Sequence, residues 1–518
     1  MNGAEIILKT ARDAGIEICF ANAGTTELPI VAAFDSISGV RPVLGLFEGV
    51  CTGAADGYGR MKQKPAMNLL HMGPGLANGI ANLHNARRAR TPVFNVIGDH
   101  ASWHLLADAP LTMDIASLAR TVSGWQRHSS SAETLARDTA DAIEASLIGQ
   151  VSSLIVPSDH QWSESNDVTI PVPEFNFDSI DLNIIDEAAT LIRRSQRPAL
   201  ILGGRALRKT GLDAAARIKA KTGCDLLMAT FPAYADRGAG LPALTRIPYF
   251  PRHARNMLKE YDAVVMAGAD EPVAFFGYKG GNSHYLSDEQ KKLRIDTDRQ
   301  DSTSAVVALA EALDAPGCGG AMSAFLAEYK LPEIPSGELN PEKMCAIIAA
   351  LQPENCIIVD EGLMSSAKYH SFAANIKPHG YITITGGAIG QGMPCSLGAA
   401  LACPDRQVIN IEADGSAMYT PQALWTQARE NTDVITLICS NRKYSTLEYE
   451  YLQAGYRKPG NNFLSLIQLG NPKIDWVGLS RGMNIPAVSV NTSQELASEM
   501  ETALGEPGPH LIEVVLNG

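Results

Sequence analysis

The stretch that decides the fold is VINIEADGS, residues 408–416, which is followed after a helical pattern by VITLICSN, residues 434–441. Each is a short, continuous apolar run that ends in a small oxygen-bearing residue, Asp414 or Asn441. Continuous runs are typical of parallel strands that are covered on both faces. Because parallel strands end at the same edge of a sheet, where ligands bind, we expect Asp414 and Asn441 to lie close together there.

Similar apolar runs alternate with helical patterns along nearly the whole chain. They occupy residues 93–98, 153–157, 199–204, 263–268, 357–360 and 511–516. Strands that alternate with helices predict an α/β fold of parallel sheets flanked by helices.

Two polar segments without periodicity, residues 158–181 and 329–341, interrupt this pattern. A chain of 518 residues is typical of about three domains. We therefore predict domains at residues 1–160, 182–328 and 340–518. The second segment ends in Asn340-Pro341, which predicts a helix start.

Charge and composition exclude several classes of protein. The net charge is −13 and no dense Lys/Arg cluster offsets it, so we expect no nucleic-acid partner. No apolar run is long enough to span a bilayer, and the N-terminal 15 residues read as an amphipathic helix rather than a signal peptide. The nine cysteines are scattered without a C-x-x-C pair. We therefore expect a cytoplasmic protein, away from membranes, with free thiols.

The residues around Asp414 suit a magnesium ion and a phosphate. One carboxylate and one amide oxygen, completed by waters and phosphate oxygens, is a usual way to hold Mg²⁺. Gly415 and Ser416 let backbone N–H groups approach an anion. The pair by itself is equally compatible with an Asp-Gly turn and a loop asparagine.

A second candidate element is VLGLFEGVCTGAADGYGR, residues 43–60, which places Glu48 between a strand and a helix of small residues. Glu48 alone is open to a simpler interpretation, that it complements the positive end of the helix. The small residues, however, allow a second backbone to pack closely.

Together these two elements resemble the thiamine diphosphate-dependent enzyme family, of the acetolactate synthase and benzoylformate decarboxylase type, over nearly the whole chain. The resemblance implies pyrimidine-binding, central and diphosphate-binding domains, with thiamine diphosphate and Mg²⁺ as cofactors. It also implies a homodimer or homotetramer with the active site at the subunit interface. In this family the glutamate that Glu48 matches binds N1′ of the aminopyrimidine and promotes loss of the C2 proton.

The resemblance assigns the other cofactor contacts by position. Asp414, Asn441 and the backbone carbonyl of Lys443 would be the metal ligands. The usual motif has glycine where this chain has Ala413, whose methyl group would crowd the loop if φ there were positive. The expected cofactor-binding residues are Ser365, Ser366, Gly387, Ile389, Gly415, Ser416 and Tyr444.

The resemblance also places substrate residues. Thr25 matches a hydroxyl that holds the substrate carboxylate, and His71 matches a catalytic histidine, although a lone histidine after an apolar run is more often structural. Thr446 and Glu450 would line the substrate side chain, and the acid at 450 favours a small or polar group. The second histidine of benzoylformate decarboxylase is missing from residues 275–278.

The predicted activity is that of a lyase or carboligase, the non-oxidative decarboxylation of a 2-oxo acid through an enamine intermediate. The alternative is acetolactate synthase-like carboligation of two 2-oxo acids. A cofactor-binding protein without catalysis and a flavin or nicotinamide oxidase also remain open. We expect neither a flavin nor a nicotinamide, since residues 202–204 and 267–272 lack the corresponding motifs.

Overall fold

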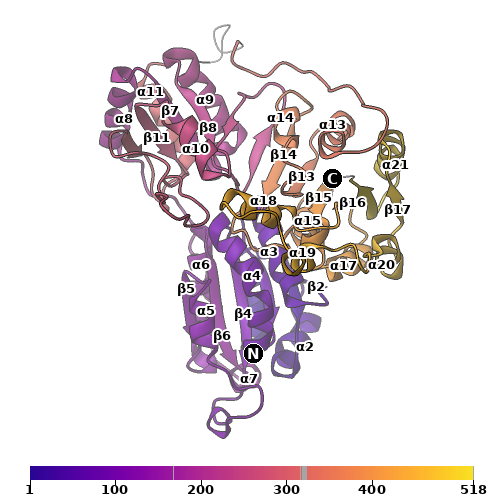
Figure 1. The fold of residues 1–518 in the computed structure, drawn as a ribbon. Coiled ribbons are helices and arrows are strands. Elements are labelled where there is room, and N and C mark those ends of the chain that lie inside the picture. Colours follow the sequence, from indigo (N-terminus) through magenta and orange to yellow (C-terminus); the bar gives the residue numbers. More distant parts are fainter. Residues whose placement is uncertain (167–168, 316, 318–323, 517–518) are drawn as a thin grey trace.

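The computed structural model describes residues 1–166, 169–315, 317 and 324–516. Figure 1 shows three α/β bodies, the N-terminal one below, the central one at upper left and the C-terminal one at right. Each contains its own sheet, and in each sheet almost every neighbouring pair of strands is parallel. The predicted fold class, parallel sheets flanked by helices, is confirmed.

The N-terminal sheet has six strands in the order β2-β1-β3-β4-β6-β5. Its strands are β1 (Ile18–Asn22), β2 (Arg41–Leu44), β3 (Ala66–Leu70), β4 (Val93–Asp99), β5 (Trp125–His128) and β6 (Val151–Pro157). The helices around it are α1 (Gly3–Asp13), α2 (Leu28–Ser36), α3 (Glu48–Lys62), α4 (Met72–Ala89), α5 (Ile115–Arg120), α6 (Leu135–Leu147) and α7 (Ser158–Trp162), with the short 3-10 helix η1 (Thr25–Glu27). Asn2 caps α1 by accepting from the backbone N–H of Glu5.

The central sheet has five strands in the order β10-β8-β7-β11-β12. They are β7 (Pro198–Leu202), β8 (Asp225–Met228), β10 (Thr245–Arg246), β11 (Ala263–Ala267) and β12 (Lys291–Arg294). The surrounding helices are α8 (Leu182–Arg194), α9 (Lys209–Thr222), α10 (Pro251–Leu258) and α11 (Ser302–Ala312).

The C-terminal sheet has seven strands in the order β17-β18-β16-β15-β13-β14-β9. They are β13 (Ile357–Glu361), β14 (His379–Thr383), β15 (Val408–Ala413), β16 (Val434–Ser440), β17 (Ala487–Val490) and β18 (His510–Val515), joined by β9 (Ala235–Arg237). The helices are α13 (Pro341–Leu351), α14 (Tyr369–Phe372), α15 (Gly392–Ala402), α16 (Asp414–Ala417), α17 (Gln422–Glu430), α18 (Ser445–Gln453), α19 (Asn461–Ile467), α20 (Trp476–Gly482) and α21 (Ser493–Gly505). The helix start predicted at Asn340-Pro341 is confirmed, since Asn340 caps α13 through the N–H of Lys343.

Two segments depart from the sequence analysis. Helix α7 begins within the segment that we expected to be an irregular linker, because the buried Gln161 donates from its side chain to the carbonyl of Val156. Strand β9 belongs in sequence to the central domain, yet it pairs antiparallel with β14 of the C-terminal sheet. Three residues are too few for a periodic pattern. The exact domain boundaries stay predictions.

The described cysteines are all free thiols, and each is buried except the half-buried Cys403. Cys318 lies outside the described residues. Among the helices that the structure describes, none combines the length and apolarity needed to cross a membrane.

Candidate functional site

Asp414 and Asn441 meet at one edge of the C-terminal sheet. Strands β15 and β16 run parallel with Ala413 opposite Cys439, so both chains leave the sheet at the same place. The Asp414 Oδ1 atom accepts from the N–H of Gly415 at 2.8 Å, and its Oδ2 atom accepts from the N–H of Arg442 at 2.6 Å. Asp414 therefore lies directly beside the segment that carries Asn441 and Lys443. Their role as metal ligands stays a prediction.

The chemistry of this group fits a hard divalent cation. Burial raises the pKa of Asp414 to about 6, which means that its carboxylate lacks the stabilisation that a nearby positive charge would supply. The described residues contain no group of three or more His, Cys, Asp or Glu side chains that would suit a metal ion. A cation here would instead rest on one carboxylate, the Asn441 amide oxygen and a backbone carbonyl, a donor set that suits Mg²⁺.

The backbone after β15 accommodates an alanine at position 413 and requires a glycine at position 415. Ala413 stands where the usual motif has glycine. Its φ is −72°, an ordinary value, so its methyl group does not strain the loop. A Cβ atom at Gly415 would lie only 2.4 Å from the Tyr444 ring. Glycine at this position therefore lets the Tyr444 ring pack against the loop.

The other residues expected at the cofactor lie on two further loops of this domain. Ser365 and Ser366 are buried after β13, and the Ser366 hydroxyl donates to the carbonyl of Leu363 at 3.3 Å. Gly387 has a φ of +74°, a left-handed conformation that favours glycine. It is exposed, and Ile389 two residues later is half-buried.

Glu48 begins α3 and is only 8% exposed. Its Oε2 atom accepts from the side-chain amide of Asn78 on α4 at 3.0 Å. A Cβ atom at Gly75 would lie 3.0 Å from Glu48 Oε1 and 3.4 Å from His71 Cβ. The structure therefore brings Glu48 and His71 together at the first turn of α4.

Sequence reasoning missed Glu27, which holds His71. Glu27 is fully buried and its Oε2 atom lies 2.8 Å from His71 Nδ1, while the same oxygen accepts from the N–H of Gly24 at 2.8 Å. An acceptor at this distance holds the Nδ1 side of the ring and leaves Nε2 free for another partner. An acid two residues after Thr25, in the loop already singled out, was the available signal.

The substrate candidates fall into two places. Thr25 is exposed on η1, next to the Glu27–His71 pair. Thr446 and Glu450 are four residues apart on α18, and so on the same face of the helix. The hydroxyl of Tyr278 donates to both carboxylate oxygens of Glu450, at 3.0 and 3.1 Å. Burial and this carboxylate raise the pKa of Tyr278, which keeps its proton.

The small residues of α3 pack against α15 of the same chain. A Cβ atom at Gly57 would lie 2.0 Å from the carbonyl oxygen of Cys395, and one at Gly398 would lie 1.9 Å from that of Ala54. The backbones of the two helices therefore touch, which only glycine permits at these positions. The close partner expected from the sequence is thus a helix of the C-terminal domain.

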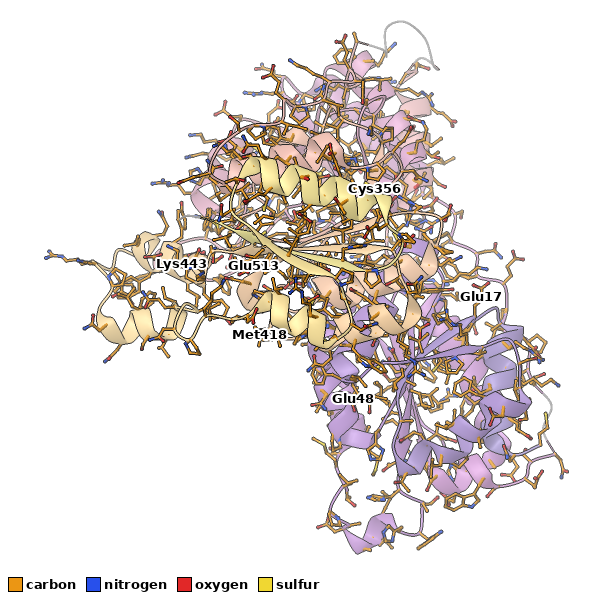
Figure 2. All side chains as sticks on the ribbon, turned by 90° about the vertical axis from the view of Figure 1, so that its right-hand side faces the viewer. Glu17, Glu48, Cys356, Met418, Lys443 and Glu513 are labelled. Atoms are coloured by element: carbon orange, nitrogen blue, oxygen red, sulfur yellow. The ribbon has the colours of Figure 1, made fainter. Side chains whose placement is uncertain are left out.

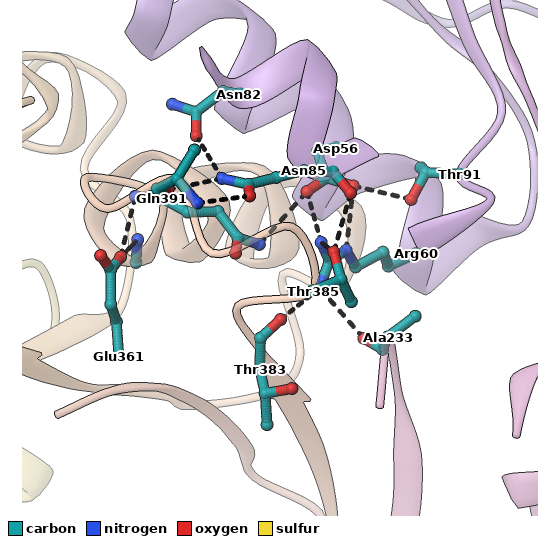
Figure 3. Close-up of polar contacts among 12 residues, drawn as sticks. Asp56, Arg60, Asn82, Asn85, Thr91, Ala233, Glu361, Thr383, Thr385 and Gln391 are labelled. Atoms are coloured by element: carbon teal, nitrogen blue, oxygen red, sulfur yellow. Dashed lines mark hydrogen bonds and ion pairs between the residues drawn. The ribbon is translucent and has the colours of Figure 1, made fainter. Parts of the chain in front are cut away.

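A buried ion pair fastens this junction. Arg60 donates to both carboxylate oxygens of Asp56, at 2.9 and 2.6 Å, and its guanidinium also donates to the carbonyl of Thr383 at 2.7 Å (Figure 3). The side chains of both residues are essentially inaccessible to solvent. The contact joins α3 to the end of β14, so the N-terminal and C-terminal domains have a defined relative position.

The two groups of candidate residues lie on different domains of the chain. Figure 2 draws Glu48 on the N-terminal domain and Lys443 on a separate part of the C-terminal domain. Two asparagines of α4 connect the region of Glu48 to the C-terminal domain. Asn78 donates to Glu48, and Asn82, four residues later, donates both to the carbonyl of Gly49 and to that of Gly390 in the C-terminal domain.

Comparison with known proteins agrees with this geometry. Residues 1–118 match the model of the thiamine pyrophosphate enzyme N-terminal TPP-binding domain, and residues 363–514 match that of the C-terminal TPP-binding domain. A Mycobacterium tuberculosis protein provisionally named acetolactate synthase large subunit IlvX is 43% identical over 519 residues, covering 100% of this chain and 99% of its own. Benzoylformate decarboxylase of Pseudomonas aeruginosa is 26% identical over 548 residues and 96% of both chains.

Among solved structures, a thiamine diphosphate-dependent 4-hydroxybenzoylformate decarboxylase of Rhodococcus jostii RHA1 has the same fold. Its TM-score is 0.86 at 23% identity, over 100% of this chain and 99% of the other. Matches to both TPP-binding domains and a 43% identical relative of equal length confirm the resemblance inferred from the Asp414 and Glu48 elements. The chain belongs to the thiamine pyrophosphate enzyme family.

Proposed function

We propose that the protein is a thiamine diphosphate- and Mg²⁺-dependent lyase or carboligase that decarboxylates a 2-oxo acid without oxidation. The observation that carries this proposal is Glu48, a buried carboxylate at a helix start whose neighbours are Asn78 and the Glu27–His71 pair. A protein that only bound the cofactor would not need an acid there. The acid is useful for moving a proton.

The C-terminal domain would hold the diphosphate end of the cofactor. Asp414, Asn441 and the carbonyl of Lys443 would bind Mg²⁺. The loops after β13, β15 and β16 would surround the phosphates through Ser365, Ser366, Gly415, Ser416 and Tyr444. Gly387 and Ile389 would contact the cofactor nearer its pyrimidine ring.

When bound, thiamine diphosphate would supply a nucleophilic carbon for the ketone and a thiazolium ring that serves as electron sink for the decarboxylation. Glu48 would hold a proton against N1′ of the pyrimidine. Thr25 would donate its hydroxyl to the substrate carboxylate. His71 would move a proton through Nε2, since the Glu27 carboxylate occupies Nδ1.

The choice between decarboxylation and carboligation depends on proton delivery. No histidine occupies residues 275–278, which weakens the route to an aldehyde and favours the acetolactate synthase-like alternative. The 43% identical relative carries an acetolactate synthase name, which supports the same alternative. Incubation with pyruvate, cofactor and Mg²⁺ separates the two: acetaldehyde indicates a decarboxylase and acetolactate indicates a synthase.

The substrate side chain should be small or polar. Glu450 and Tyr278 form a hydrogen-bonded pair on and beside α18, where an apolar aromatic group would leave a carboxylate unsolvated. A panel of 2-oxo acids with apolar, hydroxylated and cationic side chains, assayed by CO₂ release, would identify the preferred class.

We further propose that a second copy of the chain completes the site, in a homodimer or a dimer of dimers. Large apolar side chains are exposed close to both groups of candidate residues. On the N-terminal domain they include Leu44 and Leu46, and on the C-terminal domain Met418, Tyr419 and Leu447. Light scattering after size exclusion tests this directly, since a 55.3 kDa particle at micromolar concentration would contradict the proposal.

Exchange of the cofactor's C2 proton tests the proposed function. In the Glu48→Gln variant we expect cofactor affinity within about threefold of the native protein, with exchange slowed by about 100-fold or more. Asp35→Asn, which alters an exposed acid on α2, is a matched control that should change neither quantity. Equal rates of C2 proton exchange in Glu48→Gln and in the native protein would contradict the proposed role of Glu48.

A further inference from the structure

Glu361, a residue to which the proposed mechanism gives no part, joins two loops of the candidate site. It is the last residue of β13 and is 1% exposed. Its Oε1 atom accepts from the N–H of Gly390 at 2.7 Å, and its Oε2 atom accepts from the N–H groups of Gln391, at 2.8 Å, and of Gly392 (Figure 3). One carboxylate therefore binds three consecutive backbone donors at the start of α15.

The same carboxylate reaches the loop after β15. Glu361 lies opposite Glu412 in the register of β13 and β15, two residues before Asp414, and its carboxylate interacts there with the side chain of Ser416. Ser416 belongs to the Asp414–Ser416 segment, which is expected at the diphosphate, whereas residues 387–392 include Gly387 and Ile389, expected nearer the pyrimidine. Glu361 is thus a direct link between the segments that would hold the two ends of the cofactor.

Other contacts also hold residues 387–392, and one of them, from the Thr420 hydroxyl to the carbonyl of Gly390 at 2.8 Å, comes from the chain just beyond Ser416. Asn85 of α4 donates to the carbonyl of Ala388 at 2.7 Å and accepts from its N–H at 3.2 Å (Figure 3). The Gln391 side chain donates to Asp56 at 3.2 Å. The N-terminal domain therefore holds one side of residues 387–392. The distance from these residues to the Asp414–Ser416 segment must be set by contacts within the C-terminal domain.

We propose that Glu361 is a positioning residue that sets the spacing between the 387–392 loop and the Asp414–Ser416 loop, so that the pocket already fits the whole cofactor before the cofactor arrives. This inference rests on the proposed function. A carboxylate suits the task because it has enough lone pairs for four donors, and charge-assisted hydrogen bonds to backbone N–H groups are strong. A buried glutamine would accept at one oxygen only and would turn its NH₂ group toward other donors.

A neighbouring acid provides a matched control. Glu412 lies opposite Glu361 in the register of β13 and β15, is fully buried and has the same length. Its carboxyl group accepts from the Asn410 side chain at 3.1 Å and lies against Gly392, but it accepts none of the three N–H groups that Glu361 binds. Glu412→Gln therefore alters an equally buried acid on the adjacent strand without removing the bonds from Glu361 to the N–H groups of residues 390–392.

The test compares the whole cofactor with one of its parts, in the full-length protein with Mg²⁺. Glu361→Gln should weaken binding of thiamine diphosphate by about 10- to 100-fold, as loss of an outer positioning contact typically does. It should change binding of inorganic diphosphate by less than about threefold, because the loops after β13, β15 and β16 would hold that ligand and none of them includes residues 387–392. Calorimetry measures both, and Glu412→Gln should change neither by more than about threefold. Equal losses for both ligands, or no loss for either, would overturn the inference.

Hydrogen exchange of the cofactor-free protein gives a readout independent of the cofactor. The Ser416→Ala variant, which removes one hydroxyl and is not expected to disturb folding, should speed amide exchange at residues 390–392 by about threefold or more. Unchanged exchange there would contradict the link through Glu361. If the native protein failed to bind thiamine diphosphate, the proposed function would fall, while this exchange experiment would still decide whether Glu361 couples the loops.

Discussion

The two groups of candidate residues are built by different means. In the N-terminal domain the important groups are side chains held by other side chains, with Glu48 bonded to Asn78 and His71 to Glu27. In the C-terminal domain they lie on loops that follow parallel strands, and the Asp414 carboxylate is bonded to backbone N–H groups. The difference matches two tasks. Moving a proton requires an acid or base in a fixed orientation, whereas binding a cation and phosphates requires converging oxygens and amides.

The largest effect should come from the cation site. Asp414→Ala removes the only carboxylate of the expected Mg²⁺ ligands, so affinity for thiamine diphosphate in the presence of Mg²⁺ should fall by more than about 100-fold. Calorimetry measures the change. Asp405→Ala, an exposed acid of the same domain, is the control. If the affinity of Asp414→Ala for thiamine diphosphate fell by less than about threefold, the cation would not bind at this edge of the sheet.

The N-terminal group should affect turnover rather than binding. His71→Ala should lower kcat by about 100-fold, the usual size of a lost general acid or base, with cofactor affinity nearly unchanged. Glu27→Gln should lower kcat less, by about 10-fold, because the histidine remains but the Nδ1 side of its ring is no longer held by a carboxylate. Steady-state kinetics with the best substrate of the panel give both values. A fall in cofactor affinity that matches the fall in kcat would erase the contrast between the two groups.

The pH dependence of cation binding should distinguish the two groups further. Because burial raises the pKa of Asp414 to about 6, its carboxyl group in the cation-free protein takes up a proton at a higher pH than an exposed aspartate does. A proton and Mg²⁺ compete for that carboxylate, so affinity should be constant above about pH 7 and fall by about tenfold per unit below pH 6. Calorimetric titrations with Mg²⁺ and thiamine diphosphate between pH 5 and 8 measure this. A flat profile would show that Asp414 is not a ligand.

The smallest effect should come from the substrate wall. Glu450→Leu should shift kcat/KM toward apolar 2-oxo acids by about threefold to tenfold, the range of a modest change in a hydrophobic pocket. Tyr278→Phe keeps the ring and removes only the hydroxyl that binds Glu450, so the same shift should be smaller in that variant. An unchanged order of preference in both variants would place the pair outside the substrate pocket.

Much of the fold could be predicted from local patterns. Continuous apolar runs such as residues 434–439 are parallel strands, and Asn340-Pro341 starts a helix. Strand β9 and helix α7 could not be predicted, because their signals are short or polar and their stability comes from contacts distant in sequence or hidden in the core. Propensity is a weak guide wherever tertiary contacts decide the conformation.

The sequence by itself determined the α/β class, the family, and the candidate residues around Asp414 and Glu48, since each of these depends on residue types at fixed spacing along the chain. Only the tertiary structure revealed that Glu27 holds His71, that Tyr278 holds Glu450, and that Glu361 binds the backbone of residues 390–392. Each of these contacts joins residues from different elements. A hydrogen bond across such a distance depends on how the sheets and helices pack, which leaves no periodic trace in the sequence.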